Sequence, residues 1–568
     1  MQPKSRRSPV ASFWWFLASL MTLLLAAGVA TAQSASPAMD FDEARHLLNR
    51  TSFAAQTNEI DDYAKLTRQQ AVDLLLSETR RTAAYPAPAW TAKYERVYKP
   101  DMTQEERMQA NRRELVERGL EIRTWWVAEM LSTPSPLTEK MTLFWHNHFA
   151  TSQQKVRSAN LMYRQNVMLR RYSTGNFGAL LREMSKDPAM LIYLDGAQNR
   201  KGAPNENFAR EVMELFTLGE GNYSEQDIKE VARAFTGWGI DPDAGEFRFR
   251  RPAHDDGSKT VFGKEGKFNG DDIVTLLLQQ PATGEFIVSK LWREFVSPEP
   301  DVAAVKHLAA TWRAANYEMK PLLRAMFLSD AFWTPANRGV LVKSPVDLVV
   351  GSLRQFRFAV EDPAPFAVIL RQLGQDLFNP PNVKGWPVGD AWLNTTTLLA
   401  RKGFLNRLFR ADEMVKPAAV VASKSEKADV ADMAGMNSTN SMMAQPAAQL
   451  MDKDMAGQGR QRAQMRLAAR GTGAQDGGAI NVANLPPFGV SNQLRGQYSF
   501  NAEQWFTQYP LQKLAAQSMV NDATLQAQGD ERVWHTVLAG PPVQASKDVP
   551  RNLGGLRTLA LDPMYQLK

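Results

Sequence analysis

The chain contains no cysteine, and this absence removes several kinds of chemistry. Disulfide bonds, thiolate metal sites, a thiol nucleophile and a lipidated cysteine are all excluded. The sequence also has no nucleophile elbow, no phosphate-binding loop and no HExxH motif, so no named enzyme class is supported. Any imidazole chemistry must use the six histidines that the chain does contain: His46, His146, His148, His254, His307 and His535.

Excess charge is also scarce once the first residues are set aside. The whole chain has 67 basic and 60 acidic residues, a formal charge of +7. Residues 1–32 contain three basic residues and no acidic one, so the remainder has 64 basic and 60 acidic residues, or +4. A protein that binds nucleic acid normally gathers basic residues into one patch. No long basic run occurs here, so we expect no nucleic-acid partner.

Long apolar runs are limited to a single stretch, residues 13–30. A basic segment precedes this stretch, and small residues at positions 30–32 offer a cleavage site before Gln33, as in a secretory signal peptide. We therefore predict a signal peptide over residues 1–32 and a mature protein that is periplasmic or secreted, without a transmembrane span. An uncleaved membrane anchor and export by the twin-arginine route both stay open.

Aromatic residues are absent from residues 411–487, which are rich in alanine, methionine, glutamine and serine. A segment without aromatics can bury little apolar surface, so we predict a low-complexity, disordered linker. Eight of the 24 methionines lie between Met414 and Met465, and a binding tract for soft ions such as Cu(I) is the alternative. We assign residues 33–410 to the main part of one helical domain and residues 488–568 to its C-terminal part.

The apolar residues of the remaining chain recur mostly with helical spacing. Residues 112–131, for example, form a long amphipathic stretch. Only residues 245–265 look like β-structure, because side chains alternate over residues 247–250 and Asp256-Gly257 supplies a turn. We therefore predict a mainly α protein: a large multi-helical domain with a small β-hairpin and a long disordered insertion near the C-terminus.

Residues 137–149 include an H-x-H pair, His146 and His148, which suggests a metal site. In a helix, however, side chains two positions apart point about 200° apart, so one ion could not bind both unless the segment were extended. The alternative is a buried aromatic helix that carries two hydrogen-bonded histidines.

Residues 204–219 form a second polar stretch, with Asn205 placed to cap a helix and Gly219 placed to end it. Its polar residues fall on one arc of about 140°, and the arc contains no lysine. Carboxylates gathered around one arginine suggest a buried network or a cation site, and a purely structural face is the alternative. A simple pair of Glu206 with Arg210 is also open. The arc consists of Glu206, Asn207, Arg210, Glu211, Glu214 and Thr217.

Residues 254–259 lie in the expected hairpin and place His254 beside Asp255, with Lys259 following. A histidine next to a carboxylate is a reasonable acid–base or ligand set. Plain turn chemistry at the Asp-Gly step is the alternative.

Residues 378–387 combine two adjacent prolines, a glycine and Trp386 in one rigid loop, and Trp392 follows. Aromatic walls of this kind can bind a cell-envelope glycan or a peptide. Large aromatic side chains also commonly fill a core, and this is the alternative.

Three strings taken together, FWHNHF, PNENFAREVMELFTLGEGNYSEQDIKEVARAFTGW and FNPPNVKGWP, resemble the bacterial family named domain of unknown function 1800. The resemblance covers the chain from about Asp40 onward apart from the insertion. It implies an exported, mainly helical protein, with a co-encoded sulfatase-like exported protein as a partner. One departure is Gly196, where the family usually has asparagine. The residues that match its motifs are Trp145, His146, Asn147, His148, Asp195, Asn205, Glu206, Asn207, Phe208, Arg210, Glu211, Glu214, His254, Asp255 and Lys259.

Two functions from different classes follow, and the sequence leaves open whether the protein is an enzyme. The first is an envelope binding or scaffold protein that works with the sulfatase-like partner or a glycan. The second is an envelope hydrolase in which a carboxylate acts as general base and an arginine stabilises negative charge, with or without a divalent metal. The candidate catalytic residues are Glu211, Glu214, Arg210, His254 and Asp255. The candidate metal ligands are His146, His148, Glu206 and Glu211.

Overall fold

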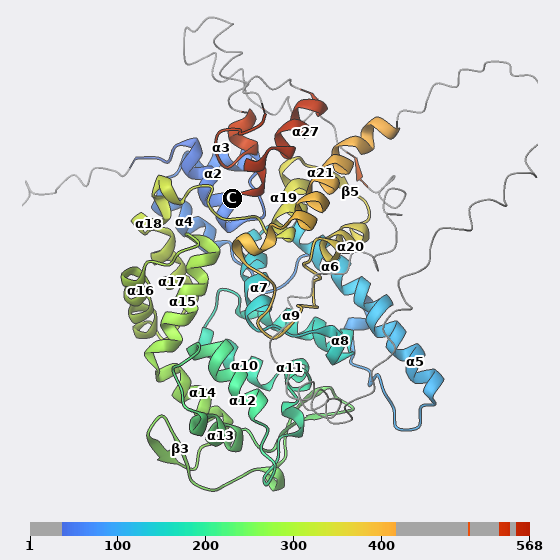
Figure 1. The fold of residues 1–568 in the computed structure, drawn as a ribbon, viewed down its shortest axis with the longest axis vertical. Helices are drawn as coiled ribbons and strands as arrows, with labels where there is room; N and C mark the ends of the chain where they lie inside the picture. Colours follow the sequence, from blue (N-terminus) through green and yellow to red (C-terminus); the bar gives the residue numbers. More distant parts are fainter. Residues whose placement is uncertain (1–36, 416–497, 500–532, 546–551) are drawn as a thin grey trace, which may run out of the picture.

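The computed structural model describes residues 37–415, 498–499, 533–545 and 552–568. Figure 1 shows that these residues are mainly helical, as predicted, with a few short strands. The predicted signal peptide and nearly all of the predicted linker lie outside the described residues. Among the described helices, none is both long and apolar enough to cross a membrane.

The first part of the described chain is built from helices, most of which are joined by short connections. They are α2 (Phe41–Thr51), α3 (Thr57–Tyr63), α4 (Arg68–Ser77), α5 (Gln104–Arg112), α6 (Arg118–Ser132), α7 (Pro136–His148), α8 (Gln153–Val156), α9 (Ala159–Tyr172), α10 (Phe177–Lys186), α11 (Pro188–Tyr193), α12 (Glu206–Met213) and α13 (Glu225–Ala234). Two π-helical segments, η2 (Arg113–Glu117) and η4 (Glu214–Leu218), continue α5 and α12.

The second half is also helical. Its helices are α14 (Gly270–Gln279), α15 (Pro281–Phe295), α16 (Val302–Ala314), α17 (Met319–Phe327), α18 (Asp330–Trp333), α19 (Pro345–Gln355), α20 (Ala364–Gln372), α21 (Thr395–Val415) and α27 (Leu553–Leu561). The C-terminal helix α27 packs on α21, so residues far apart in the sequence share one face of the molecule.

The predicted helix boundaries are set by capping side chains. Asn205 accepts a hydrogen bond from the backbone N–H of Asn207 and starts α12, as expected. Ser224 and Asp227 form a reciprocal capping box at the start of α13. Each cap satisfies backbone N–H groups that have no partner inside the helix. These local signals explain why the boundaries could be predicted without the rest of the fold.

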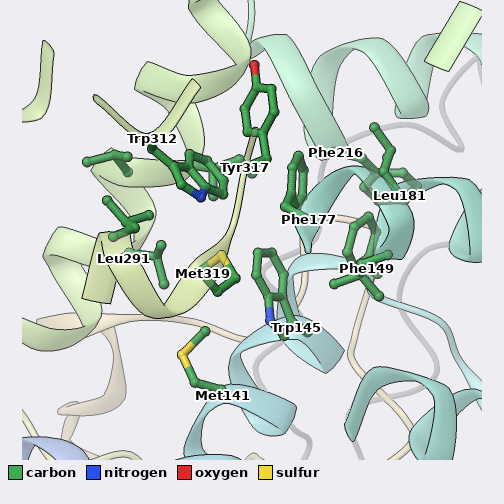
Figure 2. Packing of buried hydrophobic residues seen from close by; sticks show 14 of the residues in the cluster. Met141, Trp145, Phe149, Phe177, Leu181, Phe216, Leu291, Trp312, Tyr317 and Met319 are labelled. Carbon is green, nitrogen blue, oxygen red and sulfur yellow. The ribbon is translucent and has the colours of Figure 1, made fainter. Parts of the chain in front are cut away.

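Buried apolar residues form two clusters, and α7 contributes to both. Figure 2 shows part of the larger cluster, where Trp145 and Phe149 of the α7 region pack near Phe177 and Phe216. Leu291 of α15 belongs to the same cluster. The backbone of α7, η4 and α15 is therefore held by a common core.

The β-structure is more extensive than the single predicted hairpin. Strand β1 (Trp238–Asp241) pairs with β2 (Glu246–Phe249), and β3 (Lys259–Val261) pairs with β4 (Lys264–Gly266), both antiparallel. A third antiparallel pair joins β5 (Ala359–Val360) to β6 (Tyr498–Ser499). We had predicted a hairpin turn at Asp256-Gly257. This step lies instead between the β1–β2 hairpin and the β3–β4 hairpin.

Candidate functional site

The three side chains of the H-N-H string at the end of α7, those of His146, Asn147 and His148, each contact a different part of the structure. His146 is fully buried among the rings of Trp126, Phe378 and Trp386, with ring centroids 5.2–5.4 Å apart. Burial lowers the pKa of His146 to about 3, so this imidazole is neutral. The helical geometry therefore separates His146 from His148, as the spacing predicted.

Asn147 holds the loop of residues 378–387 against α7. Its Oδ1 accepts a hydrogen bond of 2.6 Å from the backbone N–H of Trp386. Gly385 has φ +93°, and a Cβ atom there would lie 2.2 Å from the same Oδ1, so the close approach requires glycine. Trp386 and Trp392 are only 4% and 5% exposed. The tryptophans thus fill the core, and the interpretation as a glycan-binding wall was wrong.

His148 points to a different neighbour from His146. Its Nε2 lies 3.1 Å from the backbone oxygen of Phe216, and its Nδ1 lies 3.0 Å from Nζ of Lys290 on α15. A carbonyl can only accept, so Nε2 carries the proton and Nδ1 accepts from Lys290. Burial lowers the pKa of His148 well below its usual range, which keeps the imidazole neutral.

Lys290 is the cation of this pair, and no carboxylate contacts it in the described part of the chain. Burial, together with the nearby charge of Arg293, lowers the pKa of Lys290 to about 8. The ring of Phe286 lies 5.1 Å from its Nζ atom. Near neutral pH a measurable fraction of this amine is therefore unprotonated, unlike an ordinary lysine.

The polar arc of α12 continues into η4, where the helix widens to a π-turn. Gly219 closes this turn by donating its N–H to the oxygen of Glu214, at 2.9 Å. Glu214 accepts a hydrogen bond from the hydroxyl of Tyr223. Burial and this bond raise the pKa of Tyr223. π-turns inside helices recur at functional sites, because they change the direction of the side chains that follow.

Glu211 lies one turn before Glu214 and interacts with it electrostatically. Partial burial and the charge of Glu214 raise the pKa of Glu211 to about 7, while Arg210 and Lys384 act in the opposite direction. A carboxyl group whose pKa is raised by burial and by a neighbouring carboxylate resembles the acid of many hydrolase acid–base pairs.

An open cleft of about 590 Å³ lies between η4 and α15. Each of the three strings that carried the family resemblance contributes residues to it: His148 from the first, Glu214 to Asn222 from the second, and Lys384 from the third. The lining residues are His148, Glu214, Leu215, Leu218, Gly219, Glu220, Asn222, Ala282, Glu285, Phe286, Ser289, Lys290, Arg293, Val383 and Lys384.

Arg210 does not line this cleft. Its guanidinium makes two 2.9 Å hydrogen bonds to the exposed carboxylate of Glu225 on α13, and this pairing raises its pKa. The predicted i,i+4 pair of Arg210 with Glu206 is replaced by this link between helices. The positive charge of the cleft therefore comes from Lys290, Arg293 and Lys384, and not from Arg210 as we had predicted.

His254 and Asp255 form a separate cluster on the loop between the hairpins. The Nδ1 atom of His254 lies 2.8 Å from the backbone oxygen of Thr236. Asp255 pairs with Arg233, which lowers the pKa of Asp255 to about 2. Lys259 donates to the backbone oxygen of Asp255 at 2.6 Å. These bonds tie the loop to α13, and neither residue lines the cleft.

The predicted metal ligands are not brought together. His146 is enclosed by aromatic rings, whereas both nitrogens of His148 are engaged by Phe216 and Lys290. Across residues 37–415 and the shorter C-terminal stretches that the structure describes, no three His, Asp or Glu side chains gather as a metal site would require. Of the two candidate sets, His148 and Glu214 line the cleft, whereas Glu211 interacts with Glu214 without lining it.

Sequence reasoning missed Lys290, Arg293, Tyr223 and Lys384. Tyr223 and Lys384 lie inside strings that we had quoted, so their position was a usable signal. Lys290 and Arg293 belong to α15, an ordinary amphipathic helix, and only the tertiary fold places them opposite η4.

Comparisons with known proteins give one match. No curated protein matches the chain, and no solved structure matches it. The family model described as "Protein of unknown function (DUF1800)" matches residues 46–490. This match covers more than half of the 568 residues and includes every residue of the cleft. The chain therefore belongs to the DUF1800 family.

Proposed function

We propose that the protein is an exported hydrolase of the cell envelope, which cleaves a polymer or an ester in the cleft between η4 and α15. The observation that carries this proposal is that two groups at the cleft have pKa values shifted in opposite directions. A carboxyl group with a raised pKa, Glu211, adjoins a cleft that contains an amine with a lowered pKa, Lys290. Such perturbed groups in a cleft are typical of acid–base sites.

Glu214 and Glu211 share the proton chemistry in this mechanism. Glu214 faces the cleft, accepts the Tyr223 hydroxyl and serves as the general base that activates a water molecule. Glu211, whose pKa of about 7 leaves it partly protonated at neutral pH, serves as the proton reservoir for the leaving group. Tyr223 orients the base, since its hydroxyl fixes one carboxylate oxygen.

Lys290 takes the role that we had given to Arg210. Its Nζ lies on the opposite wall of the cleft, where a cation stabilises negative charge that develops on the substrate oxygen. His148 is a positioning residue, because it holds Nζ by a hydrogen bond and is itself fixed by the Phe216 carbonyl. These steps use only side chains of this chain.

A panel of chromogenic esters and glycosides, together with isolated envelope polymers, tests the proposal. We expect turnover by the purified mature protein and a loss of 100-fold or more in Glu214→Gln, the scale of general-base catalysis. Glu225→Gln is the matched control, because it removes an exposed carboxylate outside the cleft. Turnover that survives in Glu214→Gln, or no turnover on any member of the panel, would contradict the proposal.

A second function is favoured by the state of His148. Both of its ring nitrogens are engaged within the protein, so this histidine offers no nitrogen to a substrate. A binding or scaffold protein, which works with the co-encoded sulfatase-like partner or a glycan, needs the cleft but no acid–base step. Co-purification of that partner by the wild type, and equally by Glu214→Gln, would favour this function over hydrolysis.

Export is part of both proposals and rests on residues 1–32. Intact-mass measurement of the protein recovered from its native host should give a chain that begins at Gln33. A full-length chain in the membrane fraction would instead indicate an uncleaved anchor.

A further inference from the structure

The wall of the cleft formed by α15 differs from the opposite wall in its charge. Lys290 and Arg293 are three positions apart on this helix, and both line the cleft. Residues with this spacing lie on one helix face. In the described part of the chain, neither side chain contacts a carboxylate.

The other charged groups around the cleft are already engaged or lie elsewhere on its rim. Lys384 pairs with Glu220 at 3.6 Å. Glu214 accepts the Tyr223 hydroxyl. Glu285 lies on α15 itself, five positions before Lys290, and is the remaining carboxylate of the lining. The two cations of α15 are therefore the charged groups best placed to receive a ligand.

We propose that Lys290 and Arg293 form a subsite for an anionic group of the substrate: a carboxylate, sulfate or phosphate. This inference rests on the proposed function and names its substrate class, an acidic polymer or an acidic ester. Arginine presents a planar fork that binds such groups through two parallel hydrogen bonds, and lysine adds a point charge.

The lysine is prepared for this role by its surroundings. His148 uses one of the three Nζ donors and leaves two for a ligand. Because His148 is neutral and its other nitrogen is fixed by Phe216, it positions Nζ without neutralising its charge. An incoming anion therefore displaces no internal ion pair from Lys290. It also favours the protonated amine, so binding should raise the pKa of Lys290.

The geometry also explains why the anion need not compete with the acid–base pair. Glu214 belongs to η4 and the two cations to α15, so the charges occupy opposite walls. An acidic substrate can place its anion against Arg293 and one donor of Lys290, with its scissile bond between Lys290 and Glu214. A neutral substrate would leave the partly buried charge of Lys290 without a counter-charge, which is costly.

Equilibrium binding of inorganic sulfate, inorganic phosphate and glucuronate to the purified mature protein tests the subsite. Calorimetry at pH 6.5 should detect at least one of these probes, and the probe that binds best identifies the anion class. We expect a loss of tenfold or more in Lys290→Met and a clear loss in Arg293→Met. Lys306→Met, which removes an exposed lysine of α16 outside the cleft, should bind as the wild type does.

Binding should also weaken as pH rises from 7 to 9.5, because Lys290 loses its proton in this range. The groups that face the site and titrate or carry charge are His148, Glu214, Glu285, Arg293 and the Lys384–Glu220 pair. The pH dependence of binding is therefore compared between the wild type and Lys290→Met. The part that is lost in the variant is due to titration of Lys290. Arg293→Met, at an exposed position, keeps the test valid if Lys290→Met does not fold.

Binding that is absent, or that is equal in the wild type, Lys290→Met and Arg293→Met, would overturn the subsite. The assay needs no turnover, so its outcome separates the two proposals. Anion binding without hydrolysis would remove the proposed function and keep the subsite. Hydrolysis of neutral and acidic substrates at equal rates, unaffected by Arg293→Met, would remove the subsite and keep the function.

Discussion

The two ends of α7 hold a charged or polar side chain in opposite ways. Near its start, Glu139 is fully buried and receives hydrogen bonds of 2.6 and 2.8 Å from the guanidinium of Arg170. The indole N–H of Trp126 adds a further bond of 2.8 Å. At its end, His148 contacts the cation of Lys290, and no acid neutralises that cation in the described structure.

This difference separates a structural cluster from the one that we propose to be functional. A buried carboxylate that is matched by an arginine and an indole has little capacity left for a ligand, so the Glu139 cluster stabilises the fold. An amine held in place by a neutral histidine keeps both its charge and its donors. Only the partners of the two side chains tell these clusters apart.

The largest expected effect is on the structural side of the comparison. Glu139→Gln should lower the free energy of unfolding by about 3–5 kcal/mol, because it leaves the buried charge of Arg170 without its partner. Urea denaturation followed by circular dichroism measures the change. The matched control Glu225→Gln removes an exposed carboxylate and should change stability far less. Equal losses in the two variants would show that the Glu139 cluster is not structural.

Gly219, at the edge of the cleft, should show the next largest effect. It has φ 76° and ψ 169°, a conformation that only glycine adopts readily, and an added Cβ would lie 3.0 Å from the ring of Phe286. Gly219→Ala should cost about 1–3 kcal/mol of stability and narrow the cleft. Gly175→Ala, where the nearest atom is 3.5 Å away, is the control. An unchanged melting temperature in Gly219→Ala would contradict the described geometry.

Lys290→Met should have a smaller effect of opposite sign. Because the folded state lowers the pKa of Lys290 from 10.5 to about 8, its protonated form destabilises the fold below pH 8. The variant should therefore be more stable than the wild type by about 1–2 kcal/mol at pH 7. This advantage should shrink as pH rises from 8 to 10.5, because the folded protein has then lost the proton that the unfolded chain still holds. It should vanish once the unfolded chain has lost the proton as well. Paired denaturation curves at pH 7 and pH 10 measure it, and a constant difference would contradict the assignment.

Arg210→Ala should show the smallest effect. Its pair with Glu225 is exposed to solvent, so we expect a change in stability within about 0.5 kcal/mol. We also expect no change in anion binding and only a small change in turnover, because Arg210 lies outside the cleft lining and acts on Glu211 through its charge alone. A 100-fold loss of activity in this variant would restore the role in catalysis that the sequence first suggested.

The sequence predicted the helical class and several helix boundaries, because those depend on local rules. Asn205 and Ser224 cap helices through bonds to residues only two or three positions away. The separation of His146 from His148 likewise followed from helical periodicity alone. Glu211 and Glu214 could be placed on one helix face for the same reason, and their role in a site stays a prediction.

The basic half of the site could not be predicted, because it depends on contacts between distant segments. Lys290 is 142 positions from His148, and nothing near it in the sequence distinguishes it from an exposed helical lysine. Arg210 shows the converse error. Its neighbours on the helix suggested a catalytic arginine, but its guanidinium pairs with Glu225 on the next helix.

The ionisation of Lys290 tests the central claim most directly. Competitive labelling of lysines with acetic anhydride between pH 6 and 11, read out by peptide mass spectrometry, gives a titration midpoint for each amine. We expect a midpoint near pH 8 for Lys290. A midpoint for Lys290 near 10.5 would show that the cleft holds an ordinary surface cation, and would contradict the account.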